Sequence, residues 1–447
     1  MPDLLAARSQ MAMSLGFHIV FAVVGIGLPA LMVIAEWRWI RTGDGVYLEL
    51  AKRWAKGAAI LFAVGAVSGT VLSFELGLLW PGFMRFAGSI IGMPFSLEGF
   101  AFFTEAIFLG IYLYGWNRVS RGAHLFAGIV VAASGVLSGI FVVIANAWMN
   151  TPAGFTMVGG DAVNVRPFMA MANAAAFPET LHMTLAAYAG TGLTVAGIHA
   201  IAILRGNRSA FHRRALGIAL TLGAPAGILQ PLSGDVSARS AAIHQPAKLA
   251  ALEAHFETQR GAPLHIGGWP DVDERVTRWA IRIPHGLSLL AFHDPNAEVK
   301  GLDTVPRDQW PPVAIVHVAF QVMVALGTYM ALVGLWVAFV AWRRGAALFR
   351  NRRLLAALAI ATPMGFIAIE AGWTVTEVGR QPWIVQGVLR TADAVTPMPG
   401  LVVPFVTFTL LYVMLSVIVV VLLYHMIVRA PAPGQPASRP LYPVEAE

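Results

Sequence analysis

The chain has 447 residues, of which 57% are hydrophobic and only 12% carry a charged side chain. This composition, with a mean hydropathy of +0.67, excludes a soluble globular enzyme and predicts a protein that lies in a lipid bilayer. Because the chain has no cysteine, disulfides, iron–sulfur clusters and thiolate-ligated haem are excluded, and any redox centre needs histidine, methionine or carboxylate ligands.

The hydrophobic residues gather in nine segments that are each long enough to cross a bilayer, since about 20 apolar residues span its hydrocarbon core. The predicted fold is therefore an all-α, polytopic membrane protein with nine transmembrane helices. The first segment is longer than a signal-peptide core and has no convincing cleavage site, so we expect it to be retained. The predicted spans are about 13–37, 57–80, 94–116, 124–148, 179–204, 213–234, 313–342, 354–378 and 401–428.

Arginine and lysine are concentrated in every second loop, which is the distribution found in cytoplasmic loops. It places the N-terminus and the long loop 235–312 on the outer face and the C-terminus in the cytoplasm. The net charge of +7 follows from these loops and needs no nucleic-acid partner. The basic residues of the loops are Arg38, Arg41, Lys52, Arg53 and Lys56; Arg118 and Arg121; Arg205, Arg208, Arg213 and Arg214; and Arg343, Arg344, Arg350, Arg352 and Arg353.

The histidines inside predicted spans include His18, His182, His317 and His425. Neutral imidazole is the commonest metal ligand, but a single histidine in a membrane helix is equally consistent with a hydrogen-bonded packing residue. Methionine fills helix cores far more often than it binds iron, so Met323 taken alone indicates nothing. The surrounding sequence has to decide between these interpretations.

Two acids lie in the third span, where Glu98 and Glu105 are seven residues apart and share one helix face, two turns from each other. Ionisable groups inside a bilayer are costly and usually functional, so a proton route is the favoured interpretation. Ser138 and Asn146 lie in the fourth span, where isolated polar residues would otherwise form interhelical hydrogen bonds. Glu75 is another intramembrane acid, without an assigned role.

The loop 235–312 is the only long polar segment, and loops of this length in compact proteins are usually functional. Within it, Lys248 and Glu253 belong to a segment of helical composition. They are five residues apart, or about 140° around a helix, so a direct ion pair on one face is not expected. An ordinary solvated amphipathic helix is the alternative interpretation of this segment.

The eighth span ends in two carboxylates, a guanidinium and two indoles. Trp373 and Glu377 are four residues apart on one helix face, Arg380 follows three residues later, and Pro382 ends the helix. This block resembles the GRQPW signature of subunit I of the cytochrome bd quinol oxidases. The stretch reads Glu370-Ala-Gly-Trp373-Thr-Val-Thr-Glu377-Val-Gly-Arg380-Gln-Pro-Trp383.

Further segments are similar to the same family, including Leu97–Glu105 and the surroundings of His18, His182 and Met323. The resemblance implies His18 as the ligand of haem d, with Glu98 as the acid on its distal side. It implies His182 and Met323 as the axial ligands of a low-spin haem b, and Glu377 as the ligand of a high-spin haem b. The residues implied beside the cofactors are Arg8, Trp373 and Arg380, the two arginines as partners of haem propionates.

The resemblance also implies where protons and quinol react. Glu98 and Glu105 would line the proton route together with Ser138 and Asn146. Lys248 would orient a quinol oxygen and Glu253 would accept its proton. The implied division of the chain is 1–234, helices 1–6 with ligands of haem d and low-spin haem b; 235–312, the outer Q-loop for quinol oxidation; 313–429, helices 7–9 with haem b ligands; and 430–447, a disordered cytoplasmic tail.

The chain departs from the family pattern at three places. Gln321 stands where many members have arginine, which resembles the cyanide-insensitive branch and would lower the potential of the low-spin haem. Asn117 stands where the family often has aspartate at the cytoplasmic entrance of the proton route. The separation of Glu98 and Glu105 is one residue shorter than in well-known members, a difference that a π-bulge could absorb.

The implied function is that of a terminal oxidase in the bacterial cytoplasmic membrane, which oxidises quinol at the outer face and reduces O2 to water with cytoplasmic protons, generating a membrane potential. The implied partners are subunit II, a small single-helix subunit, membrane quinone and O2. Ubiquinol or menaquinol, and haem d or haem b at the oxygen site, remain open. The alternative is a proton-coupled transporter without haem, which would require intramembrane acids but no His/Met pair.

Overall fold

The computed structural model of the chain describes residues 1–425. In this part of the chain, nine helical segments are long and apolar enough to cross a membrane, so the prediction of nine spans is confirmed for the described residues. They are α1 (Asp3–Thr42), α2 (Gly45–Leu79), α3 (Pro81–Tyr114), α4 (Arg121–Asn150), α6 (Ala176–Leu204), α7 (Ala210–His244), α10 (Val313–Arg344), α11 (Arg352–Ala361) with α12 (Met364–Val378), and α14 (Val402–Leu423).

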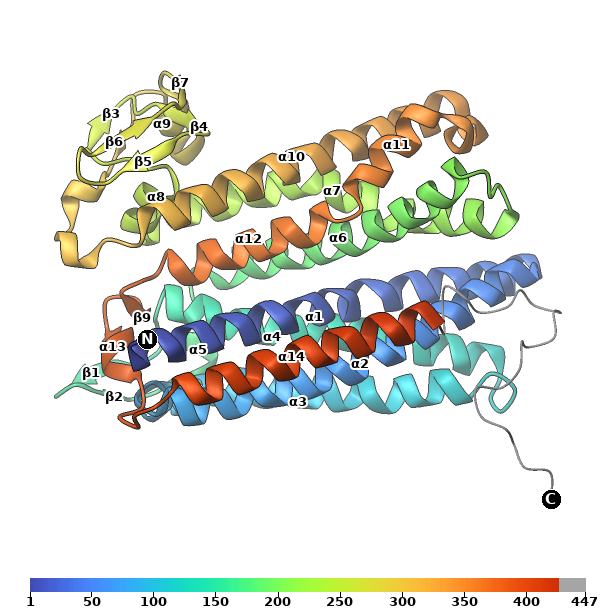
Figure 1. Cartoon of the computed structure of the whole chain (residues 1–447), viewed down its shortest axis with the longest axis horizontal. Helices are drawn as coiled ribbons and strands as arrows, with labels where there is room; N and C mark the ends of the chain where they lie inside the picture. The colour runs from blue at the N-terminus through green and yellow to red at the C-terminus, as the bar shows by residue number, and fades with distance from the viewer. Residues whose placement is uncertain (426–447) are drawn as a thin grey trace.

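The spans form two bundles that lie side by side (Figure 1). The first contains α1 to α4, with α14 packed against α1 and α2. The second contains α6, α7, α10, α11 and α12. The bundles meet where α1 and α4 pack on α6, so residues on these three helices can reach both halves of the molecule.

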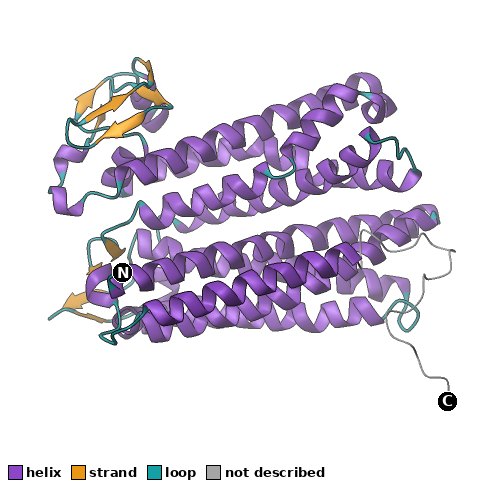
Figure 2. Cartoon of the chain, in the orientation of Figure 1, coloured by secondary structure: helices purple, strands orange, loops and turns teal. Residues whose placement is uncertain are grey.

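All strands lie at one end of the bundles, together with the N-terminus and the loop between α7 and α10 (Figure 2). We call this the loop end and the other the opposite end. The loop holds α8 (Pro246–Leu252), α9 (Gly286–Phe292) and the 3-10 turns η1 (Leu302–Thr304) and η2 (Arg307–Gln309). Its antiparallel strand pairs are β3 (Gln259–Arg260) with β8 (Glu298–Val299), β4 (Leu264–Ile266) with β7 (Ile281–Ile283), and β5 (Trp269–Asp271) with β6 (Val276–Arg278).

Short elements complete the described chain. At the loop end they are β1 (Thr156–Val158), β2 (Asp161–Val163), α5 (Pro167–Met171), β9 (Trp383–Val385), β10 (Leu389–Arg390) and α13 (Thr391–Ala394), and at the opposite end η3 (Gly345–Arg350). The predicted tail 430–447 lies outside the described residues.

Four helices that begin at the opposite end carry a side-chain cap on the first free backbone N–H groups. Asp44 caps α2, Ser120 caps α4, Ser209 caps α7 and Asn351 caps α11. Helices α3, α5 and α8 instead begin with proline, which has no N–H group to satisfy. Local sequence thus fixes where these spans start.

Several helices extend beyond the predicted spans, at the starts of α1, α2 and α3 and at the end of α7. Helix α7 continues to His244, ten residues past the predicted end of its span, because a polar segment can remain helical outside the hydrocarbon core. Asp235 and Arg239 form an i,i+4 ion pair of 2.8 Å on this extension. The loop therefore starts at 245 rather than 235.

The predicted eighth span, 354–378, is broken into α11 and α12 at Thr362 and Pro363. The Thr362 carbonyl, freed at the break, accepts a 2.6 Å hydrogen bond from Thr194 of α6. A Cβ on Gly190 would lie 3.2 Å from a side-chain atom of α12, and one on Gly365 would lie 2.4 Å from α6. Only glycine allows this close approach, which aligns α12 with α6.

Candidate functional site

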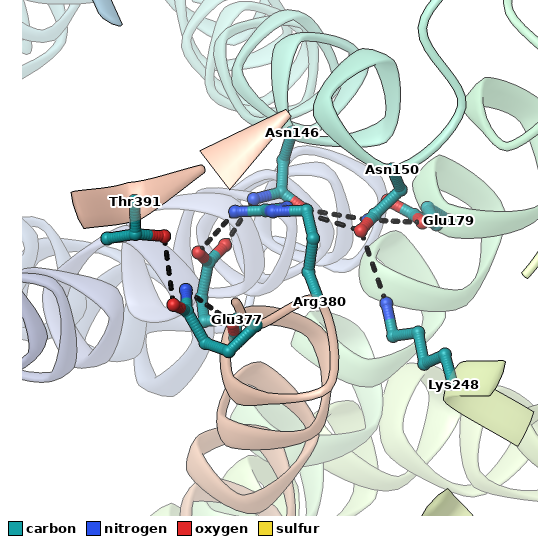
Figure 3. Close-up of polar contacts among 8 residues, drawn as sticks. Asn146, Asn150, Glu179, Lys248, Glu377, Arg380 and Thr391 are labelled. Carbon is teal, nitrogen blue, oxygen red and sulfur yellow. Dashed lines mark hydrogen bonds and ion pairs between the residues drawn. The ribbon is translucent and has the colours of Figure 1, made fainter. Parts of the chain in front are cut away.

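A network of charged and amide side chains lies at the loop end, where α4, α6, α8 and α12 meet (Figure 3). Oε2 of Glu377 lies 2.7 Å from Nη2 of Arg380. Oε1 of the same carboxylate accepts a hydrogen bond from the Asn146 amide. Arg380 is only 1% exposed, so this ion pair anchors the guanidinium just beyond the end of α12.

Asn150 joins this pair to the loop. Its Oδ1 accepts hydrogen bonds from Nη1 of Arg380 at 3.2 Å and from Nζ of Lys248 at 3.3 Å, and its Nδ2 donates to Glu179 at 2.9 Å. The structure therefore brings together Lys248, Arg380 and Glu377, which the sequence suggested for separate sites.

Asn150 and Glu179 were missed as site residues. The available signal was the i,i+4 placement of Asn146 and Asn150 at the end of one membrane span, where two amides share a helix face. Asn146 contacts Glu377 at the loop end, two turns of α4 away from Ser138.

Lys248 and Glu253 are both buried, with 7% and 4% of their surface exposed. This excludes the interpretation of a solvated amphipathic helix. Burial lowers the pKa of Lys248 to about 8, with the Glu179 carboxylate opposing the shift. Burial also raises the pKa of Glu253 to about 8, and Oε2 of that carboxyl has no hydrogen-bond partner among the described residues.

His18 and His182 have the same local arrangement. In each ring, Nδ1 lies 2.9 Å from a buried serine hydroxyl on a neighbouring helix, Ser68 for His18 and Ser233 for His182. Histidines that bind metal nearly always engage their second nitrogen in this way. Nε2 would then be the nitrogen left for a metal, and at His182 the side-chain amide nitrogen of Gln230 lies 3.1 Å from it. Both residues fit an axial haem ligand.

Met323 lies on α10, where its sulfur faces α12; a Cβ on Gly372 would be 3.0 Å from Sδ. Two residues earlier, Gln321 hydrogen-bonds the loop to α10. Its Oε1 accepts from Gly267 N at 2.9 Å, and its Nε2 donates to the His265 carbonyl at 3.0 Å. Gln321 therefore holds the loop backbone close to the methionine.

The acids of α3 are less densely paired. Ser138 donates a 2.9 Å hydrogen bond to Oε1 of Glu98, and the buried carboxylate of Glu105 lies against Gly135 of α4. The helix is uninterrupted through both acids, so no π-bulge compensates for the short spacing. Both carboxyls line the boundary between α3 and α4.

Three further residues can now be placed. Glu75 is buried and accepts hydrogen bonds from Gln10 at 2.9 Å and Ser14 at 2.8 Å, which links α2 to α1. Trp373 packs in an apolar cluster between α1, α6 and α12. Arg8 lies near the start of α1 and has no ion pair with any residue in the part of the chain that the structure describes, which leaves its charge available to a cofactor carboxylate.

Comparisons with known proteins agree with this geometry. The family described as cytochrome bd terminal oxidase subunit I matches residues 6–431. A putative cytochrome bd menaquinol oxidase subunit I of Bacillus subtilis (strain 168) is 39% identical over 433 residues, covering 95% of this chain and 97% of the relative. The cytochrome bd-II ubiquinol oxidase subunit 1 of Escherichia coli (strain K12) is 30% identical over 460 residues, covering 87% and 88%.

A solved structure, that of the bd oxidase from Geobacillus thermodenitrificans, superimposes with a TM-score of 0.89 at 39% identity, covering 96% of this chain and 99% of the other. The expected family, fold class, enzyme class and membrane location are confirmed, and the haem-free transporter is set aside. The chain belongs to the cytochrome bd terminal oxidase subunit I family and is a multi-pass subunit of a quinol oxidase in the bacterial inner membrane.

Proposed function

We propose that this chain oxidises quinol at its loop end, which faces away from the cytoplasm, and reduces O2 to water within the bundles with protons from the opposite end. When bound, the haems supply electron transfer and oxygen binding. His182 and Met323 would hold a low-spin haem b, Glu377 a high-spin haem b, and His18 a haem d or a haem b in its place. Glu98 would lie on the distal side of the His18 haem.

One observation carries this proposal: Lys248 of the loop and Glu377 of α12 belong to a single hydrogen-bonded network through Asn150 and Arg380. A site that would bind quinol and a site that would hold a haem would thereby share one network of side chains. Arg380, together with Arg8 on α1, would offset the negative charge of haem propionates. Trp373 would pack against the cofactor between α1 and α12.

The loop residues suit the chemistry of quinol oxidation, in which two electrons leave with two protons. Lys248, fixed on Asn150, would orient one quinol oxygen. Glu253 has an unpartnered carboxylate oxygen and a pKa raised by burial to about 8, which suits a general base near neutral pH. Proton release at this end and uptake at the other would charge the membrane without a dedicated pump.

Proton delivery would follow the boundary of α3 and α4. Glu105 would pass a proton to Glu98, and Ser138, which donates to Glu98, would orient that carboxyl toward the oxygen site. The difference of one residue in spacing would shorten this path by about 1.5 Å relative to a separation of eight.

The relatives are described as subunit I or subunit 1 of their oxidases, and we propose that this chain likewise assembles with a subunit II and a small single-helix subunit. Large apolar side chains cover the outer face of α2 and α3 and suit either lipid or a partner helix. They include Phe74, Leu78, Phe100, Phe103 and Ile107, each more than 60% exposed.

The first experiment is a dithionite-reduced minus air-oxidised visible spectrum of the purified complex, before and after carbon monoxide, with quinol oxidase activity on ubiquinol and menaquinol analogues. We expect a red-shifted chlorin band that responds to carbon monoxide, and selective loss of the low-spin b signal in Met323→Leu. A spectrum with haem b bands and no chlorin band would indicate that haem b, rather than haem d, occupies the oxygen site. A protein without haem would contradict the proposal.

A further inference from the structure

A second buried polar cluster lies at the opposite end of the first bundle, far from the quinol network. It consists of Glu36 on α1, Tyr112 on α3 and His124 in the first turn of α4, all at most 2% exposed. Nδ1 of His124 lies 2.8 Å from Oε1 of Glu36, and its Nε2 lies 2.9 Å from the Tyr112 carbonyl oxygen. None of these residues has a role in the function proposed above.

These contacts define how many protons the cluster holds. A carbonyl oxygen only accepts hydrogen bonds, so Nε2 of His124 carries a hydrogen. The contact between Nδ1 and Oε1 of Glu36 then needs one further proton, on either the ring or the carboxyl. With that proton present the pair is neutral overall, which suits a buried site. The pair therefore holds one proton that can be transferred.

Two atoms of the cluster remain without a hydrogen-bond partner in the described chain. They are Oε2 of Glu36 and the hydroxyl of Tyr112, and this hydroxyl is close enough to the Glu36 carboxyl to interact with it. Buried polar atoms are almost always satisfied by protein or water. The Tyr112 hydroxyl is therefore the group next to the Glu36 carboxyl to which a proton could pass from the pair toward the bundle interior.

The cluster is aligned with the acids of α3. Tyr112 follows Glu105 by seven residues, which places it on the same helix face about 10 Å further along α3. On α4, His124 is followed by Gly128, which packs on the Tyr112 ring, and by Gly135, which lies against the Glu105 carboxylate. One helix boundary thus contains both the cluster and the acids.

Basic and aromatic side chains lie between the cluster and the opposite end of the bundle. Trp116 stacks on the His124 ring with centroids 4.0 Å apart, and Nζ of Lys52 lies 5.2 Å from the Trp116 ring. Arg121, in the first turn of α4, lies over Trp39 of α1. Asn117, next to the tryptophan, has no ionisable side chain, so within this cluster Glu36 and His124 are the side chains that have a site for a transferable proton.

The geometry points to the Glu36–His124 pair as the proton-loading site of the oxygen reaction, a conclusion that rests on the proposed oxidase function. His124 takes a proton from the aqueous phase at the opposite end and shares it with Glu36. Glu36 passes it through the Tyr112 hydroxyl and intervening water to Glu105. Each step transfers one proton between oxygen or nitrogen atoms, and no electron moves.

The test uses the complete oxidase complex with Glu36→Gln, which preserves side-chain shape and an acceptor for Nδ1 but cannot carry the proton. We expect haem spectra and anaerobic haem reduction by quinol to match the wild type. Proton uptake and O2 turnover should slow at least about tenfold, since a positioned acid or base contributes 10² or more. Glu36→Asp should restore part of the rate.

His199→Gln is the matched control, because His199 is also a buried histidine near the same end, paired with His212 at 2.8 Å on α6 and α7. It should leave proton uptake unchanged. Uptake by Glu36→Gln within about twofold of the wild type would overturn the inference, because a group that titrates in the route cannot be removed without a larger loss.

A second variant, His124→Gln, removes the other proton-carrying partner of the pair. Slow uptake with intact haem spectra in both variants supports proton loading. Loss of haem in Glu36→Gln as well as in His124→Gln would show that the cluster only holds the helices together and would overturn it. A wild-type complex without haem or quinol oxidation would instead refute the proposed function, which distinguishes the two failures.

Discussion

Buried charged groups have different partners at the loop end and in the interior of the first bundle. At the loop end, Glu377 is paired with Arg380, and both are hydrogen-bonded to asparagines of α4. Along α3 and α4, Glu98 has a single hydroxyl partner and Glu105 has no cation beside it. A guanidinium, which stays charged, offsets the carboxylate beside it, whereas a buried carboxyl without such a cation has no fixed counter-charge. Under the proposed function, this difference would distinguish a site that holds a cofactor from a route that moves protons.

The loop shows the same contrast on a smaller scale. Lys248 is tied to Asn150 and lies near Glu179, while Glu253, five residues later, keeps an unpartnered oxygen. The tied residue suits orientation of a substrate, and the uncommitted one suits proton transfer. Variants of these residues test whether paired and unpaired groups differ in this way.

The largest effect is expected for Glu377→Ala. Removing one partner of a fully buried ion pair typically costs about 3–5 kcal/mol, because the remaining charge is unpaired. The cost here should lie toward the lower end of that range, because Arg380 is 1% exposed but the Glu377 side chain is 30% exposed. We expect loss of one haem b and a lower unfolding temperature, measured by pyridine haemochrome content and thermal unfolding. Arg307→Ala, which breaks the exposed pair with Asp273, should change stability by only about 0–1 kcal/mol. Equal losses of stability in the two variants would show that the buried pair and the exposed pair contribute alike.

The second prediction concerns the pH dependence of quinol oxidation. Glu253 has a pKa raised to about 8 and must lose its proton to act as a base, so kcat/KM should rise as the pH approaches 8. Lys248 has a pKa lowered to about 8 and loses its charge above that pH, so the rate should then fall. The profile should be bell-shaped with its maximum near pH 8.

The variants assign each limb of that profile. Glu253→Gln should lose the rising limb and about 100-fold in rate. Lys248→Arg should lose the falling limb, because a guanidinium stays charged. Steady-state kinetics in lipid nanodiscs measures both. An unchanged profile in either variant would assign that limb to another group.

The sequence predicted the charged residues of the site better than the amide side chain that joins them. Glu377 and Arg380 were found because they lie in a compact motif, whereas the start of α2 beside its Asp44 cap was predicted 12 residues too late. Asn150 was missed because a single amide becomes a junction only when α4, α6, α8 and α12 converge on it. The break at Pro363 was missed because hydropathy continues across it, although the freed carbonyl of Thr362 needs the distant Thr194.

A smaller effect is expected for Gln321→Ala, which removes both hydrogen bonds between α10 and the loop. Leaving the Gly267 N–H and the His265 carbonyl without partners should cost about 1–3 kcal/mol. The quinol KM should rise several-fold while the haem spectrum changes little, because Met323, the proposed ligand, is kept. Lys300→Ala, on the exposed surface of the same loop, is the control. A large spectral change with an unaltered KM would show that Gln321 acts on the haem instead.

The smallest effect is expected for Ser138→Ala, which tests the sparsely paired route. The variant removes the only hydrogen bond to Glu98 in the described chain, at a cost of about 1 kcal/mol, or roughly fivefold in rate. Oxygen reduction should slow while quinol reduction of the haems is unchanged, measured by stopped-flow absorption. Ser134→Ala, one turn earlier on α4, removes no hydrogen bond to either acid and should be neutral. A loss as large as that of Glu377→Ala would mean that the interior acids depend on fixed pairing after all, as the charges at the loop end do.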